Sequence, residues 1–185
     1  KKALINIFKE GSILFAHGFD KIRKRYHVRE FENLCKKYFN VKYCLMVSSG
    51  TAAIKIGLKS LNVKSGDEVI TQSFNFIATV EAILDIGAIP RMTSIDESLN
   101  MCSIDLKKKI NKKTKAIIPV HMLGFSADLE KIKKIANKKK IKILEDNCES
   151  IGAKFNNKYL GVHGHVGVFS FDFGYQYLHG NQKPA

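Results

Sequence analysis

Hydrophobic positions along the chain follow two alternating patterns. Short apolar runs rich in β-branched residues are typical of strands, and they occur at residues 43–48, 68–71, 89–95, 116–123, 141–146 and 166–171. Between and before them, apolar residues recur three or four positions apart, which is typical of helices that cover a core with one face. These segments are residues 28–39, 51–61, 74–87, 103–113 and 128–140.

Residues 28–39 show the helical spacing most clearly. An amphipathic helix here is expected to pack its apolar face against another part of the protein. The residues that share this face are Val28, Phe31, Leu34, Cys35 and Tyr38.

The alternation of strands and helices from residue 43 onward predicts the fold class. It indicates a three-layer α/β/α domain with a largely parallel sheet and right-handed crossovers. Gly66 and Gly87 mark turns between the units. We expect one compact domain, with its ligand site at the carboxyl ends of the strands.

Composition is consistent with a folded protein, since 45% of the 185 residues are hydrophobic. No apolar stretch reaches the length of a membrane span, and charge interrupts the opening segment before a signal-peptide core could form. A cytoplasmic location without a membrane partner is therefore expected. The four cysteines are widely spaced and form no CxxC pair, which argues against a metal site and favours buried or idle thiols.

The net charge of +14 leaves a basic nucleic-acid-binding protein as an alternative. The lysines cluster at residues 107–115 and 131–140, however, where they alternate with isoleucines as on solvated helix faces. No RNA-binding aromatic motif accompanies them, so no nucleic-acid partner is expected. Neither GxGxxG nor GxxxxGK[ST] is present, which disfavours a dinucleotide enzyme or an ATPase.

Four positions carry candidate chemistry. The small residues from Ser48 to Ala53 follow a predicted strand and open a helix, so they form either a phosphate cradle or an ordinary N-cap. Asp146 ends a buried strand, where a carboxylate either meets a cation or caps the next segment. Phe76 either stacks on a flat cofactor or belongs to the core. His121 ends another strand and either contacts substrate or hydrogen-bonds a loop.

The ordered motifs VSSGTAAIKIGLKSL, GDEVITQSFNFIATVEAIL, AIIPVHMLG and ILEDNCESIGAKFNNKYLGVHGHVGVFSF resemble the DegT/DnrJ/EryC1/StrS aminotransferases. These are fold-type-I enzymes that use pyridoxal 5'-phosphate (PLP) to aminate keto-sugars, mostly nucleotide-linked ones. The resemblance runs from about Gly18 to Gly174. It implies that residues 1–174 are the N-terminal part of a PLP-binding large domain, an aspartate aminotransferase-like fold.

The resemblance also implies roles for individual residues. Gly50, Thr51 and Ala52 would cradle the cofactor phosphate, and Ser170 would add a hydroxyl to it. Phe76 would stack on the pyridine ring, and Asp146 would keep its nitrogen protonated, so that the ring withdraws electrons during transamination. Glu149 would face the ring hydroxyl, and His121 is the candidate for substrate contact.

The sequence departs from the family after FSFDFG. Tyr175 occupies the position of the Schiff-base lysine, and Tyr cannot form an imine with PLP. Residues 175–185 do not resemble the family, and its smaller C-terminal domain is expected to be absent. We therefore expect a truncated chain that is inactive by itself.

The resemblance implies glutamate as the usual amino donor, a keto-sugar or nucleotide-sugar as acceptor, and a homodimer for full-length members. The N-terminal segment, residues 18–32, would lie near the active site and the dimer contact. The resemblance leaves open which sugar is aminated. An eight-carbon keto-sugar acid and nucleotide-linked keto-hexoses are both candidates. A non-catalytic PLP- or sugar-binding remnant is one alternative, and a sugar dehydratase that uses pyridoxamine phosphate (PMP) is another.

Overall fold

The computed structural model describes residues 1–9 and 26–172, and it divides the chain into two compact units rather than one domain. The first unit is Lys1–Met46 and the second is Val47–Ala185. The predicted boundary between residues 174 and 175 lies outside the described residues and stays a prediction.

The first unit contains α1 (Lys2–Lys9) and α2 (His27–Phe39). Helix α2 ends at Asn40, whose left-handed backbone (φ 53°) reverses the chain, and the Val41 N–H then donates to the Lys36 carbonyl. No residue of α2 is buried within the described structure, and Val28 and Leu34 are 59% and 63% exposed. The apolar face expected to pack is thus present on α2 but largely exposed.

Residues 43–48 do not form the strand that their apolar run predicts. Residues 43–46 run along α2 instead, where the Met46 N–H donates to Glu32 Oε1 at 2.8 Å. A backbone group engaged with a side chain in this way is not available for a strand ladder. The other predicted strands and helices are present, most of them shorter than the apolar runs.

The second unit is built from alternating strands and helices. Its helices are α3 (Gly50–Ser60), α4 (Ile77–Asp85), α5 (Ser103–Lys109), α6 (Leu129–Lys139) and the 3₁₀ turn η2 (Met122–Gly124). Its strands are β1 (Glu68–Gln72), β2 (Ile89–Thr93), β3 (Thr114–Ile118), β4 (Lys142–Asp146), β5 (Lys154–Phe155), β6 (Lys158–Tyr159) and β7 (Val166–Val168).

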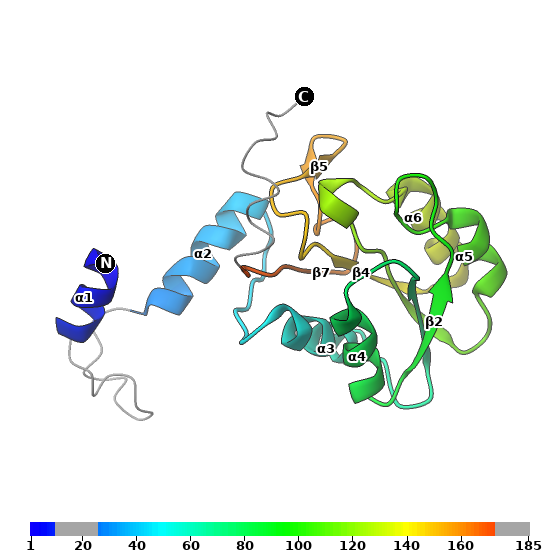
Figure 1. Ribbon diagram of the computed structural model, residues 1–185, viewed down its shortest axis with the longest axis horizontal. Helices are drawn as coiled ribbons and strands as arrows, with labels where there is room; N and C mark the ends of the chain where they lie inside the picture. Colours follow the sequence, from blue (N-terminus) through cyan, green and yellow to red (C-terminus); the bar gives the residue numbers. More distant parts are fainter. Residues whose placement is uncertain (10–25, 173–185) are drawn as a thin grey trace. The chain divides into compact units, whose positions relative to one another are not determined.

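Five of these strands form one sheet in the order β2-β1-β3-β4-β7, and every neighbouring pair is parallel. Helices α3 and α4 lie on one side of the sheet and α5 and α6 on the other (Figure 1). This arrangement confirms the three-layer α/β/α class. The short strands β5 and β6 form a separate antiparallel hairpin.

The core is divided by the pleat of the strands, since successive side chains point to opposite faces. In β1, Val69 packs with the α3 and α4 layer and Ile70 with the α5 and α6 layer. Leu144 and Ile143 divide in the same way in β4. Strands buried on both faces read as continuous apolar runs, which is why the sequence pattern predicted them.

The turn into β1 uses the two glycines expected from the sequence. Gly66 and Gly87 have φ values of +84° and +76°, and the Gly66 N–H donates to the Gly87 carbonyl at 2.9 Å. A Cβ on Gly87 would also come within 2.7 Å of the Ser65 hydroxyl. No helix among residues 1–9 and 26–172 is long and apolar enough to cross a membrane.

Candidate functional site

The parallel strands bring their carboxyl ends to one edge of the sheet, and Asp146 is the last residue of β4 at that edge. Its backbone is fixed by the chain beyond β3. The Asp146 N–H donates to the Pro119 carbonyl at 3.0 Å, and the His121 N–H donates to the Asp146 carbonyl at 3.1 Å. The position of Asp146 therefore depends on the rigid sheet and not on a loop.

The Asp146 side chain is 3% exposed, and besides the Cys148 thiol it has two hydrogen-bond donors. Thr79 Oγ1 of α4 donates to Oδ2 at 3.0 Å, and the Cys148 N–H donates to Oδ1 at 3.2 Å. An ionised carboxylate has about four acceptor positions, so these bonds orient it without saturating it. A buried carboxylate with acceptor capacity left is suited to bind a cationic N–H group.

Helix α3 begins at the predicted phosphate cradle. Ser49 is its N-cap and accepts the Ala52 N–H at 3.1 Å, so the ordinary capping role weighed from the sequence is present. The N–H groups of Gly50 and Thr51 are left without an acceptor among the hydrogen bonds of the described chain. They lie at the positive end of the helix dipole, which favours an anion.

Gly50 brings three segments together. A Cβ added there would lie 3.1 Å from Cys148 Sγ and 3.3 Å from Ser170 Cβ, so a larger residue would require these neighbours to shift slightly. The Ser170 hydroxyl thus lies beside the start of α3, as the phosphate role requires. Burial raises the pKa of Cys148, and the nearby charges of Asp146 and Glu149 raise it further, so this thiol stays neutral.

Phe76 precedes α4 and its side chain is 58% exposed, which argues against the core alternative for this ring. The Thr79 N–H donates to the Phe76 carbonyl at 3.2 Å, so the same turn carries the aromatic ring and the hydroxyl bound to Asp146. Glu149 Oε2 accepts the Leu123 N–H at 3.3 Å, which places its carboxylate beside the loop that follows β3.

His121 is buried in the core, whereas a residue that contacts substrate would have to be accessible. Its ring is fully buried, Nδ1 accepts the Ala127 N–H at 3.0 Å, and Nε2 lies 3.2 Å from Glu145 Oε2. Because Nδ1 accepts, Nε2 carries the proton and donates to the carboxylate. Both nitrogens are engaged, so His121 makes the loop contact weighed as its alternative, and its contact with substrate stays a prediction.

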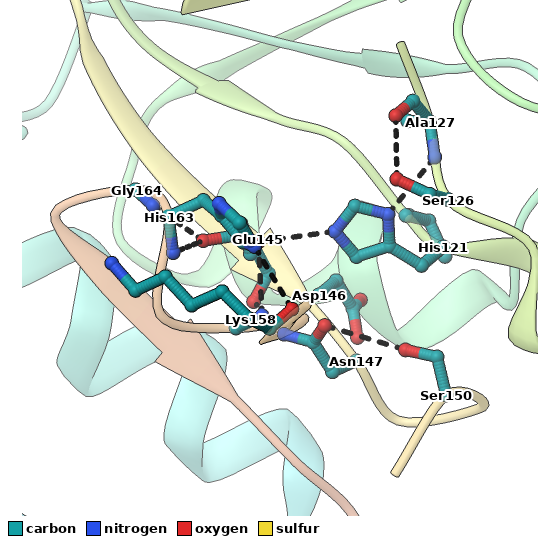
Figure 2. A network of polar contacts seen from close by, with 12 residues as sticks. His121, Ser126, Ala127, Glu145, Asp146, Asn147, Ser150, Lys158, His163 and Gly164 are labelled. Carbon is teal, nitrogen blue, oxygen red and sulfur yellow. Dashed lines mark hydrogen bonds and ion pairs between the residues drawn. The ribbon is translucent and has the colours of Figure 1, made fainter. Parts of the chain in front are cut away.

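Glu145 is the centre of this buried network (Figure 2). Besides His121, it accepts the N–H groups of Gly161 at 2.9 Å, His163 at 2.6 Å and Gly164. Burial alone would raise the pKa of Glu145, but the hydrogen bond from His121 and those from the N–H groups of Gly161 and Gly164 outweigh it and lower the pKa. Glu145 thus remains ionised and ties β4 to the loop before β7.

The structure places the described candidates in two connected groups. Gly50 and Ser170 meet Cys148, and Cys148 in turn donates its N–H to Asp146. Phe76 is linked to Asp146 through Thr79. Tyr175 lies outside the described residues. Within the described chain, no group of three His, Cys, Asp or Glu side chains is arranged to hold a metal ion.

Thr79 was not among the residues singled out from the sequence. A threonine inside a helical apolar pattern carries no motif of its own, and only its contact with Asp146 shows its part. Glu145 was also passed over, although a second acid at the end of a buried strand signals that a buried partner is needed.

The sequence profile of the DegT/DnrJ/EryC1/StrS aminotransferase family matches residues 17–177. The chain belongs to this family. GDP-perosamine synthase from Vibrio cholerae is 36% identical to it over 155 residues, which are 83% of this chain and 42% of that protein. The family membership expected from the motifs is confirmed.

Similar solved structures support the same family. An aminotransferase from Psychrobacter cryohalolentis superimposes with a TM-score of 0.79 at 28% identity, over 90% of this chain and 42% of that one. GDP-4-keto-6-deoxy-D-mannose-3-dehydratase from E. coli, solved with bound hydrated PLP, gives 0.75 at 33% identity over 88% and 43%. The fold is thus that of the PLP-dependent aminotransferases, and the chain spans about two-fifths of the length of these relatives.

Proposed function

We propose that this chain is the cofactor-binding part of a PLP-dependent sugar aminotransferase, which transfers an amino group from glutamate to a keto-sugar. The proposal rests on two features at one sheet edge. Helix α3 begins at Gly50 with N–H groups left for an acceptor, and the buried Asp146 carboxylate keeps acceptor positions for a further donor. PLP and PMP present a phosphate and a protonated pyridine nitrogen, which are the two charges that these groups would bind. The protonated ring supplies the electron sink that amine transfer requires.

Each residue of the site would contact a different part of the cofactor. The Gly50 and Thr51 N–H groups and the Ser170 hydroxyl would hold the phosphate, with Ala52 in the same first turn. Asp146 would hold the ring nitrogen, and Thr79 would orient that carboxylate. Phe76 would cover one ring face, and Glu149 would face the ring hydroxyl.

Tyr175 sets the limit of the proposed activity. Because tyrosine has no amine, the chain has no group at this position that could bind PLP covalently or carry a proton as lysine does. We therefore propose reversible, non-covalent cofactor binding without multiple turnover for the 185-residue chain. A non-catalytic remnant would also bind the cofactor reversibly without turnover. Sequence beyond residue 185 that encoded the lysine and the C-terminal domain would favour an enzyme.

A PMP-dependent sugar dehydratase is the second candidate. It is favoured by the similarity to GDP-4-keto-6-deoxy-D-mannose-3-dehydratase and by the absence of lysine at position 175. It differs from the first candidate in its product, since a dehydratase removes a sugar hydroxyl without consuming glutamate.

The test is a titration of the 185-residue chain with PMP, followed by fluorescence or calorimetry. Asp146→Asn is expected to weaken binding about thirtyfold, because a charge-assisted hydrogen bond contributes about 2 kcal/mol. Asp128→Asn is the matched control: Asp128 caps α6, Asn caps equally well, and the charge change is the same. Equal affinity of wild type and Asp146→Asn would remove Asp146 from the site.

A second arm supplies glutamate, PLP and a panel of keto-sugars and measures 2-oxoglutarate and sugar products. No turnover is expected. Multiple turnover with 2-oxoglutarate release would refute the role given to position 175, and a deoxygenated sugar without 2-oxoglutarate would favour the dehydratase. A homodimer and a cytoplasmic location also remain proposals; the exposed apolar face of α2 supports the first.

A further inference from the structure

The first compact unit contains a pair of cysteines that the cofactor site does not use. Cys35 lies in α2, and Cys44 lies in the segment of residues 41–46 that returns along this helix. How close the two thiols lie depends on how residues 41–46 are aligned with α2.

Two hydrogen bonds fix the course of the returning segment. The Val41 N–H donates to the Lys36 carbonyl at 3.0 Å, and the Met46 N–H donates to Glu32 Oε1 at 2.8 Å. As the chain runs from residue 41 to 46, its partners on α2 therefore move back from position 36 to position 32. Cys44 lies between the two tethered positions on the segment, and Cys35 lies between them on the helix.

The pattern of burial shows the same alignment. On α2, Cys35 is half-buried together with positions 32, 36 and 39, which share one helical face. On the returning segment, Cys44 is half-buried together with positions 41 and 46, whereas positions 42, 43 and 45 are exposed. The two thiols thus belong to the faces that pack against each other.

The thiols also interact directly. Burial raises the pKa of Cys44 to about 11, and the charge and side-chain hydrogen bond of Cys35 add to this effect. At neutral pH Cys44 is therefore protonated. Both cysteines are free thiols in the structure.

We propose that Cys35 and Cys44 are a redox-active pair that closes to a disulfide. The two hydrogen bonds align residues 41–46 with α2 so that Cys44 lies opposite Cys35, and a disulfide requires such proximity of the two residues. This pair is independent of the proposed cofactor chemistry.

The oxidant is a low-molecular-weight disulfide such as glutathione disulfide. The Cys35 thiolate attacks one sulfur of the oxidant and releases one glutathione as thiolate. Cys44 then loses its proton and attacks Cys35 Sγ in the mixed disulfide, which releases the second glutathione. Two protein thiols are oxidised and one glutathione disulfide is reduced to two glutathiones.

The test uses the reduced 185-residue chain, treated with glutathione disulfide and quenched in acid. Of the four thiols, two are expected to disappear, and peptide mapping is expected to join the peptides of Cys35 and Cys44. Cys35→Ser and Cys44→Ser should each abolish the linkage, and Cys44→Ser should leave glutathione on Cys35. Cys102→Ser with Cys148→Ser is the matched control and should still form it.

A measurement on the wild type alone protects the test against variants that fail to fold. In concentrated urea the equilibrium constant for the exchange is expected to fall roughly tenfold or more, because the unfolded chain no longer holds the thiols together. Three results would each overturn the proposal. The folded chain could keep four intact thiols, the disulfide could use Cys102 or Cys148, or the exchange constant could be the same with and without urea. Because PMP is absent from every arm, these results do not depend on the cofactor site.

Discussion

The hydrogen bond between Thr79 and Asp146 allows the clearest test of how the proposed site is built. Thr79→Val replaces the hydroxyl with a methyl group of similar size at a side chain that is 1% exposed. The substitution removes the donor to Asp146 Oδ2, at 3.0 Å, and leaves the carboxylate with the Cys148 N–H. Hydrogen bonds to charged groups contribute about 1.5–3 kcal/mol, so we expect the free energy of unfolding to fall by this amount.

Binding of PMP is expected to weaken about fivefold in Thr79→Val. The carboxylate remains, but one of the two bonds that orient it is lost, and a misaligned charge-assisted hydrogen bond costs about 1 kcal/mol. Thr79→Ser keeps the hydroxyl and should retain most of the affinity. Urea denaturation gives the stability, and calorimetric titration gives the dissociation constant.

Thr71→Val is the matched control, because Thr71 is equally buried and its hydroxyl donates to the Ile118 carbonyl at 3.0 Å. This bond is in the same sheet but does not involve Asp146. The control should lose stability, by about 1 kcal/mol, and keep its PMP affinity. If Thr79→Val and Thr71→Val lost stability and both bound PMP like the wild type, the link from Thr79 through Asp146 to the cofactor would be refuted.

Three further predictions follow from other parts of the structure. Gly50→Ala should weaken PMP binding, because its Cβ would crowd Cys148 and Ser170 beside the proposed phosphate site. Its loss of stability should be small, because alanine has a helix propensity about 1 kcal/mol better than glycine; titration gives the affinity and urea denaturation the stability. The pKa of Glu145 is lowered in the folded protein, so the ionised side chain stabilises the fold above its ordinary pKa of 4.5. This stabilisation is lost as the pH falls through the lowered pKa. Below pH 4.5 the urea midpoint should therefore fall more steeply with pH in the wild type than in Glu145→Gln. Leu34→Glu should shift any dimer toward monomer in analytical ultracentrifugation without changing PMP affinity, whereas an unchanged dimer would exclude the α2 face as a contact.

The layered fold was predictable because its signals are local. Parallel strands covered on both faces need continuous apolar runs, and the helices between them need one apolar face, so β1 to β4 and α3 to α6 could be recognised from spacing. Residues 43–48 carry the same kind of run, and here the prediction was wrong. An apolar run does not specify its partner, and in this structure residues 43–46 have α2 as their partner.

The site could be predicted only in part. Gly50 and Asp146 stand at element boundaries, where the sequence marks a helix start and a strand end. Their neighbours come from distant parts of the chain: Ser170 follows β7 and Thr79 lies within α4, and no sequence spacing encodes those contacts. His121 has both ring nitrogens bound within the core, which its position at a strand end did not reveal.

The two acids that end β4 show how the fold separates structural charge from charge kept for a ligand. Glu145 and Asp146 are consecutive, both buried, and point to opposite sides of the strand. Glu145 accepts hydrogen bonds from four donors, one of them the His121 ring, so its acceptor positions are filled inside the protein. Asp146 has neutral donors and no cation among its described hydrogen-bond partners. A buried carboxylate needs a compensating charge to remain ionised without cost. We therefore propose that a cationic ligand completes the environment of Asp146, while Glu145 ties β4 to the loop before β7.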